Sequence, residues 1–197
     1  MSQLRTNLPN LNPDLLQLLV FLEAFTSIAA SILKCQQSQI LGACVPAAVS
    51  VSGFLTMHGF PAVPLPVNAY VKAWVLGPKG WELRGKAAVY GKGGNPTLGF
   101  QGHMIVSIGQ IVFDPTLGQL QPLGAQIPSQ IVLQKHGCPP LIASYENFLP
   151  SWSVEYKRWN GPSTKAVRAL RNVSKRNDDA VVAALEREWQ ARHPNLP

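Results

Sequence analysis

The sequence predicts an α+β domain in which apolar helices pack on an antiparallel sheet and further helices follow at the C-terminal end. Two apolar segments carry helix-start signals, one over residues 13–34 and one beginning at Cys44. β-branched and aromatic residues then concentrate in residues 62–76 and 81–90, which predicts two strands joined by the turn GPKG. Two shorter strands flank Gly109, and strands joined by such short turns pair antiparallel.

Length and composition place the chain among globular proteins. Its 197 residues suit one domain with a small appendage, and 46% hydrophobic against 14% charged residues exclude a disordered protein. Acidic residues are scarce between Glu23 and Glu146, where only Glu82 and Asp114 occur. This scarcity makes Asp114 conspicuous and a candidate functional residue.

The formal net charge of +7 raises the question of a nucleic-acid partner. Much of the basic excess lies in residues 157–192, where neither a nucleic-acid-binding motif nor a pattern of stacking aromatics accompanies it. We interpret these charges as a solvated helical surface and expect no nucleic-acid partner. A protein partner bound through the C-terminal helices is the alternative.

The apolar stretch over residues 15–33 contains Gln17, Glu23 and three hydroxyl residues, which favours a buried or partner-covered helix over a membrane span. A signal peptide ending near Ala29 and Ala30 is the alternative. The three cysteines form neither a disulfide framework nor a CxxC metal pattern, which predicts a reducing compartment. We therefore expect a cytoplasmic protein, with a secreted or delivered effector as the second possibility, and we identify no metal or cofactor motif.

Both N-terminal helices have recognisable ends. The tripeptide NPD at residues 12–14 supplies a cap, a proline at the first helical position and an acid in the first turn of the helix over residues 13–34. Pro46 fits the first turn of the helix that begins at Cys44, and Gly59 fits the position after its last turn.

The C-terminal part is expected to be helical. Beyond Leu120 prolines interrupt the chain to about Pro150, and helices are then predicted over residues 164–175 and from Asn177 to about Arg192. The second of these helices carries an apolar stripe that we expect to pack against the domain or a partner, formed by Val181, Leu185 and Trp189.

Residues 102–118, GHMIVSIGQIVFDPTLG, form the second predicted hairpin. Gly109 and Gln110 fit a two-residue type II′ turn, which fixes the strand register and places Val106 opposite Phe113. Because side chains alternate between the two faces, one face of this hairpin is apolar core and the other carries every polar side chain of both arms.

His103 and Asp114 lie on that second face as diagonal neighbours. Their Cβ atoms are expected about 7 Å apart or less, a distance that an imidazole and a carboxylate can span with one hydrogen bond. Such a bond selects the imidazole tautomer that can accept a proton on its other nitrogen. An ordinary cross-strand polar pair is the alternative interpretation.

Cys44 is the candidate nucleophile. A thiol at a helix N-terminus meets the positive end of the helix dipole and unpaired amides, which favours the thiolate and can stabilise an oxyanion. Its alternative is a small buried hydrophobic residue. Cys35 is expected to be structural, and Cys138 with His136 offers only two ligands, too few to predict a metal site.

Two stretches resemble the transglutaminase-like branch of the papain-like cysteine enzymes. GACVPAAVSVSGFLTMHGFPAV resembles the G-x-C, the small-residue apolar helix and the G-[hydrophobic]-P-A of that superfamily. GHMIVSIGQIVFDPTLG resembles its histidine strand, turn and following strand ending in D-P-T. Together they cover about residues 42–118, and the short hairpin is similar to that of the compact bacterial peptidase-like members. The resemblance implies a papain-like core with the cysteine helix packed on an antiparallel sheet.

The resemblance also implies roles for individual residues. Cys44 corresponds to the nucleophile, His103 to the base and Asp114 to the residue that orients the base. Papain-like enzymes often draw an oxyanion side chain from a glutamine shortly before the cysteine, and here Gln37 or Gln39 occupies such a position.

The function that we expect is cysteine-dependent acyl transfer, most simply hydrolysis of peptide or glutamine-type amide bonds by a Cys-His-Asp triad. Residues 1–150 then form the catalytic domain, and residues 151–197 a basic helical extension. The glycine-rich residues 91–102 run into the histidine strand and are placed to shape a substrate cleft. The alternatives are a transglutaminase or acetyl-transferring enzyme with the same triad, and a non-enzymatic adaptor that keeps the fold.

Overall fold

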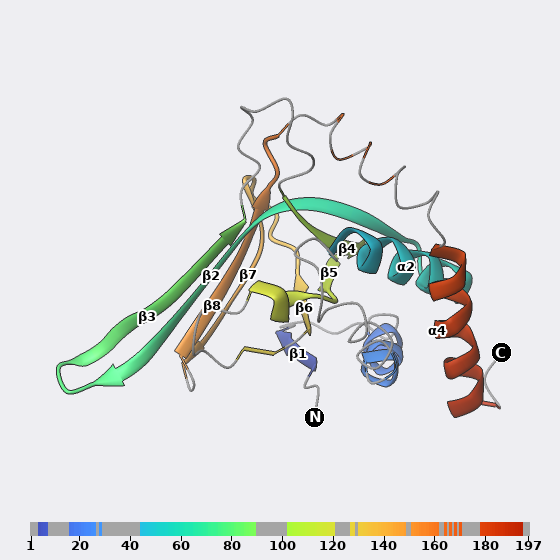
Figure 1. The fold of residues 1–197 in the computed structure, drawn as a ribbon, viewed down its shortest axis with the longest axis horizontal. Helices are drawn as coiled ribbons and strands as arrows, with labels where there is room; N and C mark the ends of the chain where they lie inside the picture. The colour runs from blue at the N-terminus through green and yellow to red at the C-terminus, as the bar shows by residue number, and fades with distance from the viewer. Residues whose placement is uncertain are drawn as a thin grey trace.

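The computed structural model shows an eight-stranded sheet with helices beside it (Figure 1). Among the residues that it describes, no helix is both long and apolar enough to cross a membrane. The described residues are 4–7, 16–26, 28, 44–89, 102–120, 127–128, 130–148, 151–161, 164, 166, 168, 170 and 178–194.

The sheet is mixed but predominantly antiparallel. Its order is β1-β6-β5-β4-β2-β8-β7, with β3 paired to β2, and among these pairs only β1 with β6 is parallel. The strands are β1 (Leu4–Asn7), β2 (Ala62–Gly77), β3 (Gly80–Val89), β4 (His103–Ile108), β5 (Ile111–Asp114), β6 (Gln130–Gln134), β7 (Leu141–Phe148) and β8 (Ser151–Arg158).

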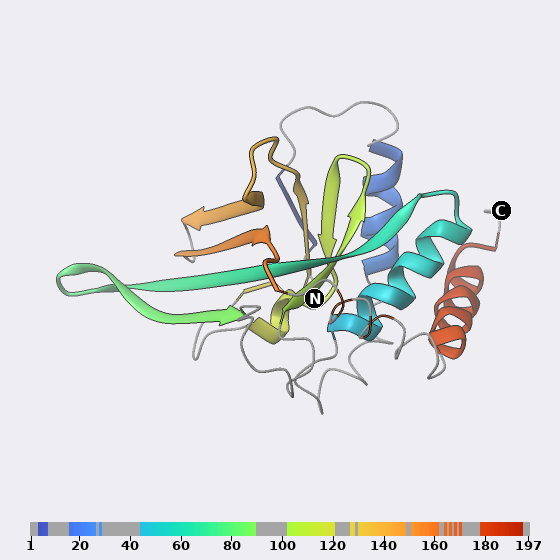
Figure 2. The same ribbon diagram turned by 90° about the horizontal axis from the view of Figure 1, so that it is seen from above.

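The long strand β2 connects the parts of this sheet. Its first half pairs with β4, and its second half pairs with both β3 and β8. The antiparallel β2–β3 hairpin with its GPKG turn was predicted and is confirmed. Figure 2 shows this hairpin extending away from the helices.

The sheet curls toward a barrel. Its last strand, β7, approaches β6, and the backbone N–H of His136 after β6 donates to the Ile142 carbonyl on β7 at 2.6 Å. One consequence is that side chains on the inner face of distant strands can meet across the curve.

Three helical segments lie side by side at one end of the molecule (Figure 2). They are the N-terminal helix (residues 16–26 and 28), α2 (Cys44–Met57) and α4 (Asp178–Arg192). Residues 164, 166, 168 and 170 are also helical. Each predicted helix is confirmed over the residues described.

The end of α2 follows the predicted chemistry. Gly59 has a φ of +82°, which a residue without a Cβ adopts at little cost. Its N–H donates to the Thr56 carbonyl at 3.1 Å, and the N–H of Phe60 donates to the Leu55 carbonyl at 2.9 Å. These two bonds satisfy carbonyls that the helix leaves unpaired and end α2 in a Schellman motif.

Two hydrophobic clusters cover the two faces of the sheet. The helix-side cluster holds Leu185 and Trp189 of α4, so the predicted apolar stripe packs against the domain. It also contains the predicted apolar face of the β4–β5 hairpin, formed by Met104, Val106, Ile108, Ile111 and Phe113. The inner cluster fills the curve of the sheet and includes Ile105, Val112, Trp152 and Val154.

One expectation about the C-terminal part is wrong. Residues 151–158, which the sequence assigned to a helical extension, form β8 between β2 and β7. Strands β6 and β7 also occupy part of the proline-interrupted region, where none was predicted. Prolines lie in the links around these strands rather than in them, and cross-strand burial outweighs the weak local signal.

Candidate active site

Cys44 is the first residue of α2, as predicted, and its exposed fraction is only 6%. The N–H groups of Cys44 and Val45 lie in the first turn, where a helix supplies no acceptor for them. Pro46 has no N–H to lose, so the turn accommodates it without cost. The thiol therefore stands beside amide donors at the positive end of a helix of 14 residues.

The β4–β5 hairpin has the predicted register. Val106 pairs with Phe113 and Ile108 with Ile111, and Gly109 in the turn has a φ of +52°. His103 opens β4 and Asp114 closes β5, so both stand at the same end of the hairpin.

The predicted hydrogen bond between these two residues is present. His103 Nε2 lies 2.8 Å from Asp114 Oδ2, and the two side chains are 2% and 1% exposed. Nε2 is the donor in this bond, because the charged Asp114 carboxylate can only accept hydrogen bonds.

The Asp114 carboxylate is held by four donor atoms. Oδ1 accepts from the Thr116 N–H at 2.8 Å and from the Thr116 hydroxyl at 3.3 Å. Oδ2 accepts from His103 and from the Tyr156 hydroxyl, which lies 2.5 Å away. The Asp-Pro-Thr turn thus supplies two of the bonds, and the carboxylate has little freedom to rotate away from His103.

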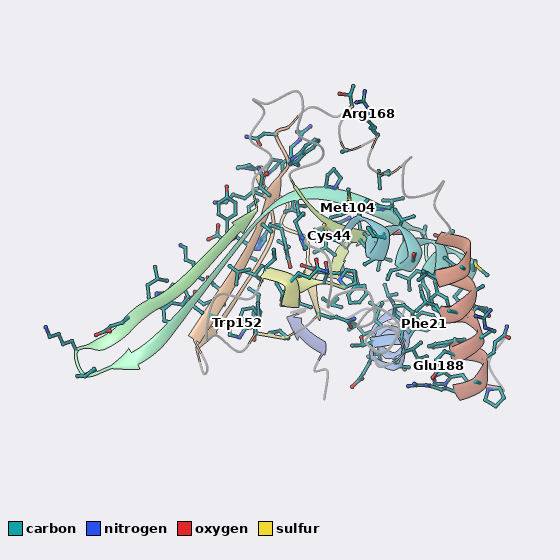
Figure 3. The ribbon with its side chains drawn as sticks, in the orientation of Figure 1. Phe21, Cys44, Met104, Trp152, Arg168 and Glu188 are labelled. Atoms are coloured by element: carbon teal, nitrogen blue, oxygen red, sulfur yellow. The ribbon has the colours of Figure 1, made fainter. Side chains whose placement is uncertain are left out.

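Cys44 is the second polar group that acts on His103, because its side chain also raises the pKa of the imidazole. Asp114 occupies Nε2, so Nδ1 is the ring nitrogen that the carboxylate does not engage. Figure 3 shows Cys44 where the start of α2 meets β4. The structure therefore brings together the three residues that the sequence singled out.

The protonated form of His103 is strongly favoured. Burial lowers the pKa of its imidazole, but the Asp114 charge and hydrogen bond, together with the Cys44 hydrogen bond and charge, outweigh burial and raise it from 6.5 to about 10. His103 is consequently an imidazolium at neutral pH, paired with the Asp114 carboxylate.

The site lies where the two hydrophobic clusters meet. Cys44 belongs to the helix-side cluster, whereas His103 and Asp114 share their sheet face with members of the inner cluster. His103 is the terminal residue of its strand, and α2, which begins with Cys44, packs against that strand.

Sequence reasoning missed Tyr156. This residue is fully buried on β8, and its hydroxyl donates a hydrogen bond to Asp114. Its ring lies nearly parallel to the His103 ring, with 6.3 Å between the ring centroids and 10° between the ring planes. The inward alternation of Trp152, Val154 and Tyr156 was a readable strand signal. Burial, then the Asp114 charge and hydrogen bond, raise the pKa of Tyr156 well above 10, so its hydroxyl remains a donor.

Other candidates are not part of this arrangement. Gln37, Gln39 and Cys35 lie outside the described residues, as does most of the stretch over residues 91–102. Cys138 is an exposed free thiol, and the neighbouring His136 bonds Ser144 at 3.0 Å. Within the described ranges, no three His, Cys, Asp or Glu side chains gather in a group that could hold a metal ion.

Comparison of the chain with known protein families, curated proteins and solved structures finds no significant match to any of them.

Proposed function

We propose that this protein is a cysteine-dependent acyl-transfer enzyme that hydrolyses peptide or glutamine-type amide bonds. One observation carries the proposal: His103 is hydrogen-bonded to Asp114, and its pKa is raised by both Asp114 and Cys44, the first residue of α2. A nucleophile, a base and a residue that orients the base form the minimal set for covalent catalysis of acyl transfer.

The first half-reaction forms a thioester. The Cys44 thiolate attacks the carbonyl carbon, and the oxyanion that develops is stabilised by N–H groups at the start of α2. The His103 imidazolium gives its Nδ1 proton to the departing nitrogen, the C–N bond breaks and an amine leaves. Asp114 keeps Nε2 protonated throughout and holds the ring in place.

The second half-reaction releases the acyl group. Neutral His103 takes a proton from water at Nδ1 while the water oxygen attacks the thioester carbon. The C–S bond breaks, a carboxylic acid leaves, and the thiolate–imidazolium pair is restored. With an amine in place of water, the same steps give transamidation, so both reactions belong in the assay.

Selective labelling of Cys44 tests the proposal. At pH 7 we expect iodoacetamide to modify Cys44 at least about tenfold faster than Cys138, as followed by peptide mass spectrometry. Exposure alone predicts the opposite order, because Cys138 is exposed and Cys44 is buried. His103→Gln, which can still donate to Asp114, should abolish the difference, and His103→Ala should do the same.

Equal slow labelling of the cysteines, unchanged by either His103 variant, would rule out the enzyme and favour an adaptor that keeps the fold. If Cys44 is reactive, a panel of peptide amides and glutamine-containing proteins, assayed with and without a labelled primary amine, separates hydrolysis from transamidation. Cys44→Ser is the matched inactive control for that panel.

A further inference from the structure

The hydroxyl of Tyr156 and the imidazole of His103 donate to the same carboxylate oxygen. Both bonds end on Asp114 Oδ2, at 2.5 and 2.8 Å, while Thr116 occupies Oδ1. The two donors therefore share the negative charge of one atom. A second donor on an oxygen lowers the charge that the first donor experiences.

The fold makes a place for the Tyr156 ring. Its cross-strand neighbours on both sides are alanines, Ala69 on β2 and Ala143 on β7, and all three residues are fully buried. Small neighbours leave room for the ring to reach across the curved sheet toward β5 and to lie against His103. Packing alone could be satisfied by phenylalanine, so the hydroxyl requires a separate explanation.

We infer that Tyr156 is a positioning residue that holds the Asp114 carboxylate and moderates its attraction for the His103 imidazolium, an inference that rests on the proposed function. Without the hydroxyl, Oδ2 concentrates its charge on His103 and binds the imidazolium more tightly. Proton transfer from Nδ1 to the departing nitrogen then becomes harder, because the imidazolium is too stable. Tyr156 thus keeps the general acid competent.

The titratable groups that face His103 among the described residues are Asp114 on β5, Cys44 on α2 and Tyr156 on β8. Asp114 and Cys44 both favour the protonated imidazole. Tyr156 opposes them indirectly through Asp114, and it does so as a neutral donor because the Asp114 charge and burial keep its hydroxyl protonated.

Tyr156→Phe isolates the hydroxyl, since it keeps the ring and leaves no new buried donor unpaired. The His103 imidazole is followed by NMR in protein labelled with ¹⁵N-histidine, with assignment from His103→Gln. We expect the titration midpoint of His103 to rise by about one pH unit in Tyr156→Phe. At pH 7 the NMR resonance of the Nε2 proton should move downfield, because the hydrogen bond from Nε2 to Asp114 Oδ2 strengthens. This second measurement does not require alkaline conditions.

Tyr145→Phe is the matched control. Tyr145 lies on the neighbouring strand β7, and its ring packs against Trp152. This control should leave both NMR readouts of His103 unchanged, while thermal unfolding confirms that each variant is folded. An unchanged or lowered midpoint and an unmoved Nε2 proton in folded Tyr156→Phe would overturn the inference.

The same variant connects the inference to chemistry. In Tyr156→Phe the alkaline limb of the pH profile for iodoacetamide labelling of Cys44 should move to higher pH, together with the titration midpoint of His103. In the amide-hydrolysis assay kcat should fall by a larger factor than KM changes. The NMR readouts need no activity. Unselective labelling of Cys44 in the unsubstituted protein would therefore defeat the proposed function, whereas an unmoved His103 resonance would defeat only the role of Tyr156.

Discussion

His103 and Asp114 form a 2.8 Å ion pair although their side chains are only 2% and 1% exposed. Removing two charges from water is costly, and this cost is offset here by a complete set of hydrogen bonds around the carboxylate. Losing one member of such a pair leaves the other buried without its countercharge, so the protonation state of His103 is coupled to the stability of the fold.

Stability should therefore fall as the solution becomes alkaline. The pKa of His103 is about 10 in the folded protein against 6.5 for the unperturbed group. The folded state binds the proton more tightly, so this contribution is fully present below pH 6.5 and is lost as pH rises through about 10. Urea unfolding between pH 6 and about 10.5 measures the change.

The comparison with His103→Gln separates this contribution from other titrating groups. The difference in unfolding free energy between the unsubstituted protein and His103→Gln should shrink as pH rises over that window. A difference that stays constant across the window would contradict the coupling.

Asp114→Asn should reduce the reactivity of Cys44. The substitution keeps the shape of the side chain but removes the charge, so burial dominates and the pKa of His103 falls. At pH 7.5 the imidazolium is lost, and we expect iodoacetamide labelling of Cys44 to slow by about 10²-fold. Glu155→Gln, which removes a half-exposed carboxylate from β8, is the charge-matched control and should label at the original rate.

Trp189→Ala should destabilise the whole domain. Trp189 is 3% exposed, and its ring centroid lies 4.3 Å from that of Phe21 in the N-terminal helix. Truncating a buried tryptophan costs about 3–5 kcal/mol, and thermal unfolding should show this loss as one cooperative transition at lower temperature. The control is Arg187→Ala, which changes an exposed residue of the same helix and should leave Tm almost unchanged. Equally small decreases in Tm for Trp189→Ala and Arg187→Ala would mean that the packing of α4 does not stabilise the domain.

Gly109→Ala tests the turn that sets the hairpin register. The φ of +52° is unfavourable for a residue with a Cβ, while nothing lies within 4 Å of where that atom would stand. The cost is then backbone strain alone, about 1 kcal/mol by chemical denaturation. Gly109→Asn should cost less, because asparagine tolerates this region better.

Gly137→Ala provides the matched control for this prediction. Its Cβ would also meet nothing within 4 Å, and no positive φ restrains it. Equal losses at Gly109 and Gly137 would show that the turn conformation is not the cause.

The parts of the site that the sequence predicts are those determined by local chemistry. A two-residue turn with glycine first fixes the register of its hairpin, and this register places His103 within reach of Asp114. Capping signals likewise place Cys44 at a helix start. Each of these inferences involves residues close in sequence, where periodicity and turn geometry suffice.

The role of Tyr156 could not be predicted in this way, because Tyr156 and Asp114 are 42 positions apart in the sequence. The curvature of the sheet brings them together. No local pattern states how far a sheet curls or which strand faces which across the curve. The strand β8 was missed for a related reason, since its alternation is flanked by prolines and basic residues that favour a loop or a helical surface.

The position of β8 between β2 and β7 has a consequence for synthesis. Cys44, His103 and Asp114 leave the ribosome well before Tyr156, yet the strand that carries Tyr156 is an interior member of the sheet. A nascent chain that ends before residue 151 leaves β2 and β7 without their common neighbour, and closure has to wait for contacts of long sequence separation. The last donor to the Asp114 carboxylate is thus synthesised late, and the hydrogen bonds around that carboxylate are complete only once β8 has entered the sheet.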